Sequence, residues 1–266
     1  MDLILSLPTS VVEADIQWLP NIAGEWHGIE LHGTALDDDS LWSGLVDRLP
    51  LPVLHVHELL PTPVTRNLPE APIATRNRLT DHLRRLLERA AAMSVRTATL
   101  DFGLTVDAGT KWNDALDRRV ELLLSLMPLA EALEIVLCVD LRVPVTRGDD
   151  IINAGGLRLA NEIMHPNCQL TLDVFPFDLP EEFDLAGLVK QYLFRVAVLR
   201  TNYEPALGLR PRPQRLTEWC QALQRQNYHG SICFCPDVES PEFCQREFER
   251  LTADLETAGD DDDDDE

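Results

Sequence analysis

The residues best suited to chemistry are carboxylates, histidines and an arginine that stand in or at the ends of short apolar runs. Their types are those of metal ligands, acid–base catalysts and anchors for a polar substrate: Glu30, His57, Asp101, Asp140, Asp173 and Arg200. Carboxylate oxygens and imidazole nitrogens bind divalent cations, and both groups transfer protons when their surroundings adjust the pKa. Such side chains act together only if the fold brings positions from most of the chain to one place.

Eight apolar runs predict strands, and amphipathic segments that predict helices separate them. The runs are rich in Val, Ile, Leu and Cys, as in strands buried on both faces of a parallel sheet: 3–7, 28–31, 53–57, 97–102, 135–141, 169–174, 194–200 and 231–235. Eight strand–helix units predict an α/β fold, a single (β/α)8 barrel over residues 1–257. The alternative is an open doubly wound sheet, which the lack of a glycine-rich phosphate motif after the first strand disfavours.

Side chains within these runs alternate between two kinds, as in strands with two different faces. The apolar kind, which includes Leu31, Leu54 and Leu172, is expected to pack against helices. A buried polar group without a partner costs about 1–3 kcal/mol, so the other face needs hydrogen bonds or a ligand. That face is expected to point into the barrel: Glu30, His32, His55, His57, Thr99, Asp101, Cys138, Asp140, Thr171, Asp173, Cys233 and Cys235.

Two closely spaced pairs have both a chemical and an ordinary interpretation. His55 and His57 stand on one strand face at a spacing that can chelate a metal, but hydrogen-bonded core histidines are the favoured reading. Cys233 and Cys235 also share a face, and buried thiols are favoured over a soft-metal site.

The longest irregular stretches follow strands, at 60–74, 142–150 and 202–213. In a barrel they lie at the C-terminal face, where active sites are built. We therefore expect a group of substrate-binding residues there: His57, Asp101, Arg142, Arg200 and Asn202. For Arg142, Arg200 and Asn202, which follow strands, the alternative is that they are ordinary polar residues of surface loops.

The charge of the chain limits its partners. The formal net charge is -22, and seven of the negative charges lie in the last seven residues. We expect residues 258–266 to form a disordered acidic tail, because like charges repel and no apolar surface opposes them. An acidic protein repels phosphate backbones and anionic lipids, so nucleic acid and membrane surfaces are disfavoured as partners. The N-terminal residues lack the pattern of a signal peptide, so the cytoplasm is the expected compartment.

Several segments resemble the xylose isomerase-like barrel superfamily, which includes sugar isomerases, sugar epimerases and an apurinic endonuclease branch. Residues 26–31 resemble its second strand, and residues 228–232 resemble the approach to its last strand. Residues 134–140 resemble the strand that ends in a metal-binding Glu, and residues 170–173 the strand that ends in a metal-binding Asp. The resemblance implies a barrel fold, sugar chemistry and a divalent cation held by Glu, Asp, His and Glu from strands five to eight.

The implied metal cradle is half present in this sequence. Asp140 and Asp173 match the first two ligands, while Val198 and Cys235 fall near the third and fourth. Two carboxylates alone hold Mg²⁺, Mn²⁺, Co²⁺ or Zn²⁺ weakly. Further ligands are expected from other polar residues: Glu30, His57, Asp101, Cys235 or Asp237. The alternative is that Arg200 pairs with the carboxylates as a permanent cation and removes the need for metal.

Three functional hypotheses follow, and catalysis itself stays open among them. The first is a divergent sugar or sugar phosphate isomerase or epimerase, in which Asp140 and Asp173 hold metal or polarise the substrate. Glu30 would then be the base, alone or as a proton-transfer pair with His32. The second is a non-catalytic barrel that binds a small molecule or serves as a scaffold. The third, an endonuclease, is disfavoured by the acidic charge and by missing histidine positions.

Overall fold

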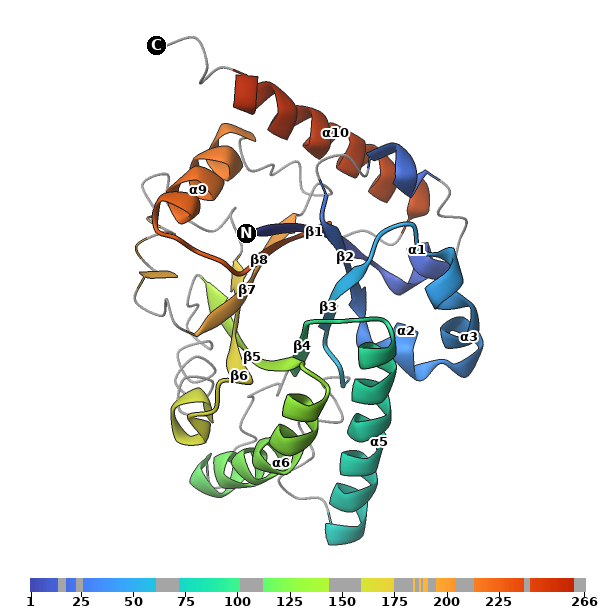
Figure 1. Ribbon diagram of the computed structural model, residues 1–266, viewed down its shortest axis with the longest axis vertical. Coiled ribbons are helices and arrows are strands. Elements are labelled where there is room, and N and C mark those ends of the chain that lie inside the picture. The colour runs from blue at the N-terminus through green and yellow to red at the C-terminus, as the bar shows by residue number, and fades with distance from the viewer. Residues whose placement is uncertain are drawn as a thin grey trace.

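Eight parallel strands form a closed barrel in chain order, which confirms the predicted (β/α)8 fold. The strands run around a central ring (Figure 1): β1 (Asp2–Leu7), β2 (Gly28–His32), β3 (Val53–His57), β4 (Thr97–Leu100), β5 (Val136–Val143), β6 (Cys168–Val174), β7 (Val196–Tyr203) and β8 (Ser231–Pro236). The computed structural model describes residues 1–13, 18–22, 26–60, 72–100, 112–143, 159–174, 184, 187, 189–190, 195–203, 213–236 and 240–260.

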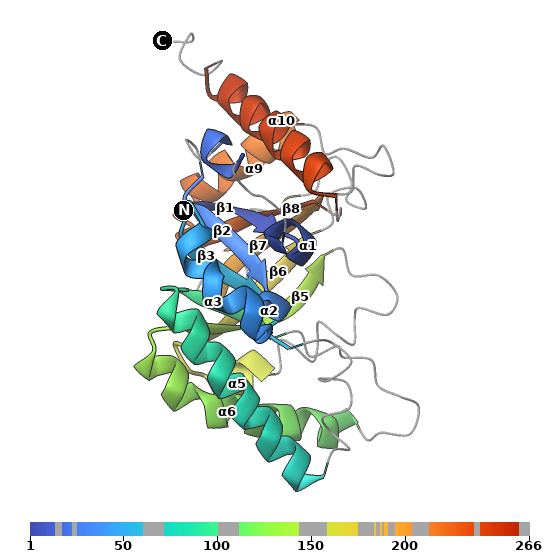
Figure 2. The same cartoon turned by 90° about the vertical axis from the view of Figure 1, so that its right-hand side faces the viewer.

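Helices surround the strands (Figures 1 and 2). They are α1 (Thr9–Glu13), the short 3-10 helix η1 (Leu19–Ile22), α2 (Gly33–Asp37), α3 (Asp39–Arg48), α5 (Ile73–Ala92), α6 (Trp112–Ala132), α9 (Pro213–Arg225) and α10 (Pro241–Asp260). Among the described residues, no helix is long and apolar enough to cross a membrane. Helix α10 continues to Asp260, so residues 258–260, which we expected in the acidic tail, are helical. Residues 261–266 lie outside the described part.

The apolar faces of strands and helices form one core around the barrel. On α5 the predicted stripe is buried: Leu79, Leu83, Leu86, Leu87 and Ala90. Outward-facing strand residues such as Ile29, Leu31 and Leu172 belong to the same cluster. Burial contributes about 25 cal/mol per Å² of apolar surface, so this shell decides which face of each strand points inward. The alternate residues are thereby directed into the barrel.

Leu54 is the exception to the predicted alternation. The pairing of β2 with β3 moves from Ile29–Val53 to Glu30–His55, so β3 carries one extra residue at this point. Leu54 consequently packs in an inner cluster with Ile4, Cys138, Val198, Cys233 and Cys235, and the expectation that it faces the helices is wrong. A β-bulge breaks the period of two on which that expectation depended.

The interior otherwise has the predicted polar character. Several charged or polar residues of the inner faces are almost completely buried: Glu30, His55, Thr99, Asp140, Thr171, Asp173 and Arg200. The barrel thus has an apolar shell and a polar interior, and the interior positions the candidate site.

The bulge allows a stability test at Gly28. A Cβ atom there would lie 2.5 Å from Cγ of Leu54 and 2.7 Å from the Pro52 carbonyl oxygen. We expect Gly28→Ala to lower the free energy of unfolding by about 1–3 kcal/mol, because the backbone cannot yield. Gly44, inside α3, is the matched control, since its Cβ would meet only Arg48 Nε at 3.6 Å. Gly44→Ala should raise stability by about 0.5–1 kcal/mol in urea denaturation. Equal effects would contradict the assigned register.

Candidate functional site

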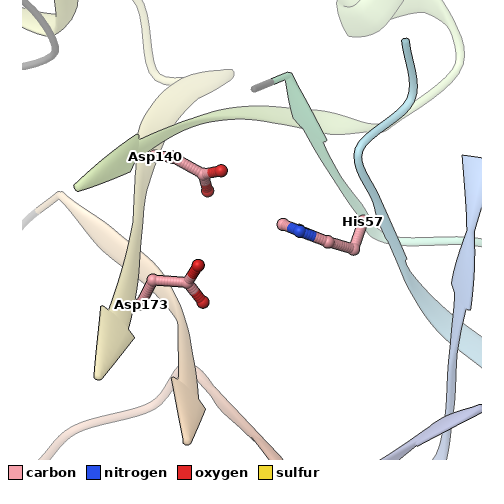
Figure 3. A group of neighbouring side chains, drawn as sticks. All are labelled: His57, Asp140 and Asp173. Atoms are coloured by element: carbon pink, nitrogen blue, oxygen red, sulfur yellow. The ribbon is translucent and has the colours of Figure 1, made fainter. Parts of the chain in front are cut away.

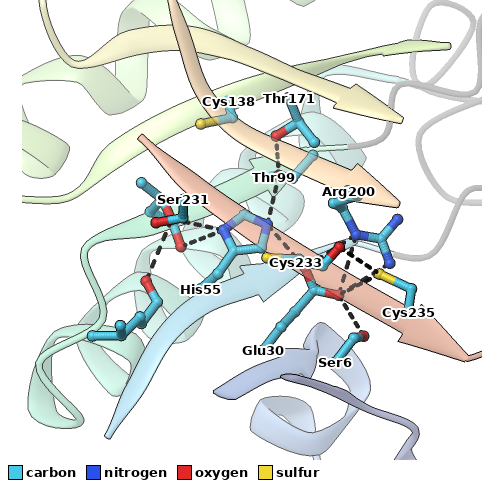
Figure 4. Close-up of polar contacts among 12 residues, drawn as sticks. Ser6, Glu30, His55, Thr99, Cys138, Thr171, Arg200, Ser231, Cys233 and Cys235 are labelled. Atoms are coloured by element: carbon cyan, nitrogen blue, oxygen red, sulfur yellow. Dashed lines mark hydrogen bonds and ion pairs between the residues drawn. The ribbon is translucent and has the colours of Figure 1, made fainter. Parts of the chain in front are cut away.

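An ion pair between Arg200 and Glu30 crosses the barrel interior (Figure 4). Arg200 stands on β7 and Glu30 on β2, with β8 and β1 between them in the ring. The Arg200 Nε donates to both carboxylate oxygens of Glu30 at 3.1 and 3.0 Å, and Nη2 donates at 3.0 Å. Nη1 donates to Asp173 Oδ1 at 2.8 Å, so one guanidinium joins carboxylates from two strands.

The Glu30 carboxylate is held ionised. Burial raises its pKa, but the charge and the hydrogen bonds of Arg200 outweigh this effect, and the pKa lies well below its ordinary value. Ser6 Oγ donates a further hydrogen bond of 2.6 Å to Oε1. A carboxylate with a strongly lowered pKa is a weak base. The geometry therefore suits Glu30 to anchoring Arg200 better than to the basic role expected from the sequence.

His55 is a core histidine with hydrogen-bond partners on both ring nitrogens. Nδ1 lies 2.7 Å from Thr97 Oγ1, and Nε2 lies 3.0 Å from Thr99 Oγ1, which in turn contacts Thr171 Oγ1 at 2.7 Å. Burial lowers the pKa of His55 to about 4, although Glu30 Oε2 lies only 3.5 Å away. The ring is therefore neutral at pH 7. It links the ion pair to a chain of hydroxyl groups and agrees with the favoured sequence interpretation.

His57, Asp140 and Asp173 point toward one space from β3, β5 and β6 (Figure 3). Each offers one ligand atom, and the three atoms lie within 4.8 Å of one another. Burial lowers the pKa of His57 well below its ordinary value, so its ring is neutral and can donate a lone pair. Among the described residues, the buried His57 Nδ1 atom has no hydrogen-bond partner. One imidazole nitrogen and two carboxylates fit a divalent cation.

The sequence-predicted residues thus separate into two connected groups. Glu30, Arg200 and Asp173 form the ion network, and Asp173 joins it to His57 and Asp140. Three other candidates cannot be placed in either group. Asp101 lies outside the described residues. Arg142 lies in β5 and Asn202 in β7, but their side chains are not among those described.

The positions of the third and fourth implied ligands contribute none. Val198 packs in the inner cluster. The Cys235 thiol lies 3.8 Å from Glu30 Oε1, and burial raises its pKa well above its ordinary value. Among the described side chains of β7 and β8, Arg200 therefore lies closest in role to the permanent cation of the alternative expectation, since it pairs with Asp173.

One contact near the site was missed by sequence reasoning. His32 Nε2 lies 2.7 Å from Oε2 of Glu58, and not of Glu30, with which it was considered as a proton-transfer pair. Glu58 follows β3 directly and therefore lies outside the alternating strand pattern. Its position immediately after His57 was the available signal.

Comparison with known proteins shows similarity of fold. No protein-family model and no curated protein sequence matches the chain. Among solved structures, 3-keto-D-glucoside 4-epimerase YcjR from E. coli has a TM-score of 0.67 at 14% identity, with 95% of this chain and 99% of that chain covered. D-Psicose 3-epimerase from Clostridium cellulolyticum H10, solved with D-tagatose, has a TM-score of 0.63 at 19% identity. The match covers 98% of this chain and 97% of that chain. The structure of the IOLI protein with a zinc atom has a TM-score of 0.64 at 13% sequence identity. The match covers 98% of this chain and 97% of the IOLI chain. The chain has the fold of the xylose isomerase-like barrels, as its sequence indicated.

The ion pair yields a prediction of stability. We expect Glu30→Gln to lower the free energy of unfolding by about 3–5 kcal/mol, because it leaves Arg200 buried with too little counter-charge. Glu121 pairs with Arg76 at 3.7 Å on the surface and is 71% exposed, so Glu121→Gln serves as the control, with an expected loss below about 1 kcal/mol. Denaturant unfolding measures both, and equal losses would contradict the central role of the pair.

The lowered pKa of His55 predicts a dependence on pH. Because the folded pKa of about 4 lies below the unfolded value near 6.5, the unfolded chain binds the proton first as the pH falls. Stability should therefore decrease between pH 6.5 and 4, with His55 contributing a slope of about 1.4 kcal/mol per pH unit. Unfolding free energies of wild type and His55→Gln test this. An unchanged slope in the variant would show that His55 is not the group responsible.

Proposed function

We propose that this chain is an isomerase- or epimerase-type barrel that acts on a small sugar and uses a divalent cation held by His57, Asp140 and Asp173. The observation that carries the proposal is the convergence of these three ligand atoms within 4.8 Å from three separate strands. When bound, a divalent cation polarises carbonyl and hydroxyl oxygens of a sugar. The mixed nitrogen and oxygen ligands favour Zn²⁺, Mn²⁺ or Co²⁺ over Ca²⁺.

The remaining interior residues hold this cluster in place. Arg200 fixes Asp173 Oδ1, and Glu30 fixes the other side of the guanidinium. Supporting groups of this kind orient ligands, and their loss commonly reduces metal affinity 10- to 100-fold. His55, neutral and bonded to Thr97 and Thr99, adds no charge to the site. The cluster is thus preorganised on strands.

The substrate class is inferred from the neighbours and from charge. The solved structures of similar fold include D-psicose 3-epimerase with D-fructose or D-tagatose and a 3-keto-D-glucoside 4-epimerase. An unphosphorylated sugar suits this site better than a sugar phosphate, because the guanidinium of Arg200 already serves two carboxylates. The net charge of -22 likewise disfavours nucleic acid.

A second candidate function is a sugar-binding barrel without catalysis. The observation in its favour is the salt bridge of 2.8 Å from Arg200 to Asp173, which supplies a permanent cation beside the cluster. Val198 and Cys235, at the positions of the two missing ligands, also agree with it. This candidate shares the fold and the interior cluster with the first but predicts no turnover.

Metal binding is the first test. We expect one Mn²⁺, Co²⁺ or Zn²⁺ per chain by calorimetry, and at least about tenfold weaker binding in Asp140→Asn or Asp173→Asn, because each loses a charged ligand. Asp81→Asn, an exposed change on α5, is the control and should bind as wild type. Absence of binding below millimolar metal would exclude the metal-dependent form.

Turnover separates the two candidates. The metal-loaded protein is incubated with D-fructose, D-tagatose or D-psicose, and the products are separated by chromatography. Conversion that Asp140→Asn abolishes and Asp81→Asn retains supports the isomerase or epimerase. Sugar binding without conversion supports the binding barrel.

A further inference from the structure

A pair of side chains, His32 and Glu58, lies beside the cluster of His57, Asp140 and Asp173. Nε2 of His32 lies 2.7 Å from Oε2 of Glu58, and the ring centroid of His32 lies 6.4 Å from that of His57. Both side chains are partly exposed, at 32% and 22%. We propose that Glu58 is a catalytic acid–base residue of the site and that His32 positions it. This inference rests on the proposed isomerase or epimerase function.

The backbone at Glu58 is strained and held in place. Its φ angle is 49°, in the left-handed region that favours glycine and that a long side chain rarely adopts. The next residue, Leu59, donates its N–H to the Thr99 carbonyl at 2.8 Å. A Cβ atom on Gly33 would lie 2.4 Å from the Glu58 carbonyl oxygen, so the chain ends of β2 and β3 are packed tightly. Strain that is retained beside a candidate site is typical of functional residues.

The hydrogen bonds of His32 define its tautomer. The Thr34 backbone N–H donates to Nδ1 at 3.3 Å, so Nδ1 carries no proton in the neutral ring. The proton is then on Nε2, which donates to Glu58. Thr34 Oγ1 also lies 2.9 Å from Nδ1 and 2.8 Å from Thr9 Oγ1. His32 is therefore a fixed donor that sets the direction of the Glu58 carboxylate.

The chemistry requires a base that Glu30 does not provide. The Glu58 carboxylate takes a proton from the carbon next to the sugar carbonyl, and the C–H electron pair moves into a new C=C bond while the carbonyl oxygen takes the charge. The adjacent hydroxyl proton passes to that oxygen. Glu58 then returns its proton to the former carbonyl carbon, the C=C electron pair forms this C–H bond, and the oxygen that lost its proton becomes the new carbonyl, which gives the isomer. Return of the proton to the original carbon on the same face regenerates the starting sugar. No oxidant or reductant is needed.

Solvent exchange tests the proton transfer directly. Metal-loaded protein is mixed with D-fructose, D-tagatose or D-psicose in D₂O, and deuterium at carbon is followed by NMR. We expect exchange in wild type and at least a 100-fold slower rate in Glu58→Gln, with metal affinity within twofold of wild type. The control Glu88→Gln, an exposed change on α5, should exchange as wild type. Exchange at the wild-type rate in Glu58→Gln would overturn the assignment.

Three further variants separate catalysis from structure. Glu58→Gly relieves the left-handed backbone, so its melting temperature should equal or exceed that of wild type while exchange is lost. His32→Ala should slow exchange, and His32→Gln, which keeps a donor, should restore part of the rate. A destabilised Glu58→Gly variant, or His32→Ala with the wild-type rate, would overturn the proposal. Absence of exchange in metal-loaded wild type would instead reject the isomerase or epimerase function on which it rests.

Discussion

The interior of this barrel depends on one guanidinium group that neutralises carboxylates from opposite parts of the ring. Glu30 and Asp173 are almost fully buried, and an isolated buried carboxylate costs several kcal/mol of desolvation. Arginine suits the task because it is always protonated and its planar fork binds two partners at once. Beside this ion network, the neutral His55 ring needs only hydrogen bonds, and the chain through Thr99 to Thr171 supplies one of them.

Because of the same interaction, the candidate metal ligands come from other strands than the resemblance implied. The resemblance implied ligands from the fifth to the eighth strand, but Arg200 on β7 and the Cys235 thiol on β8 direct a cation and a buried thiol toward Glu30. The ligand atoms that converge instead come from β3, β5 and β6. Asp173 belongs to both groups, so the ion network and the metal cluster cannot change independently. This coupling helps to hold the three candidate ligand atoms in order, although Val198 and Cys235 stand at the other two implied positions.

Sequence patterns identified the fold and most of the interior because strand number and side-chain alternation are local properties. Alternation identified Glu30, Asp140 and Asp173, and Arg200 was identified by its position at the end of the seventh strand. Alternation assigns a residue to a face but not to a partner, so the pairing of Glu30 with Arg200, 170 residues later in the chain, was not predicted. The bulge at Leu54 and the contact of His32 with Glu58 depend on the register between neighbouring strands. The sequence of one strand does not determine that register, so neither feature was predicted.

The apolar shell holds the fold together, and the polar interior forms the candidate site. This separation accounts for the similarity of fold between this chain and the epimerases despite their low sequence identity. The shell packs strand against helix through residues such as Leu31 and Leu86, none of which faces the site. Its burial offsets costs in the interior, including the strained backbone of Glu58. The barrel therefore persists in chains of very different sequence, as the epimerases of similar fold at 14–19% identity illustrate. It follows that the inward-facing residues, and not the fold, decide what such a barrel can bind or convert.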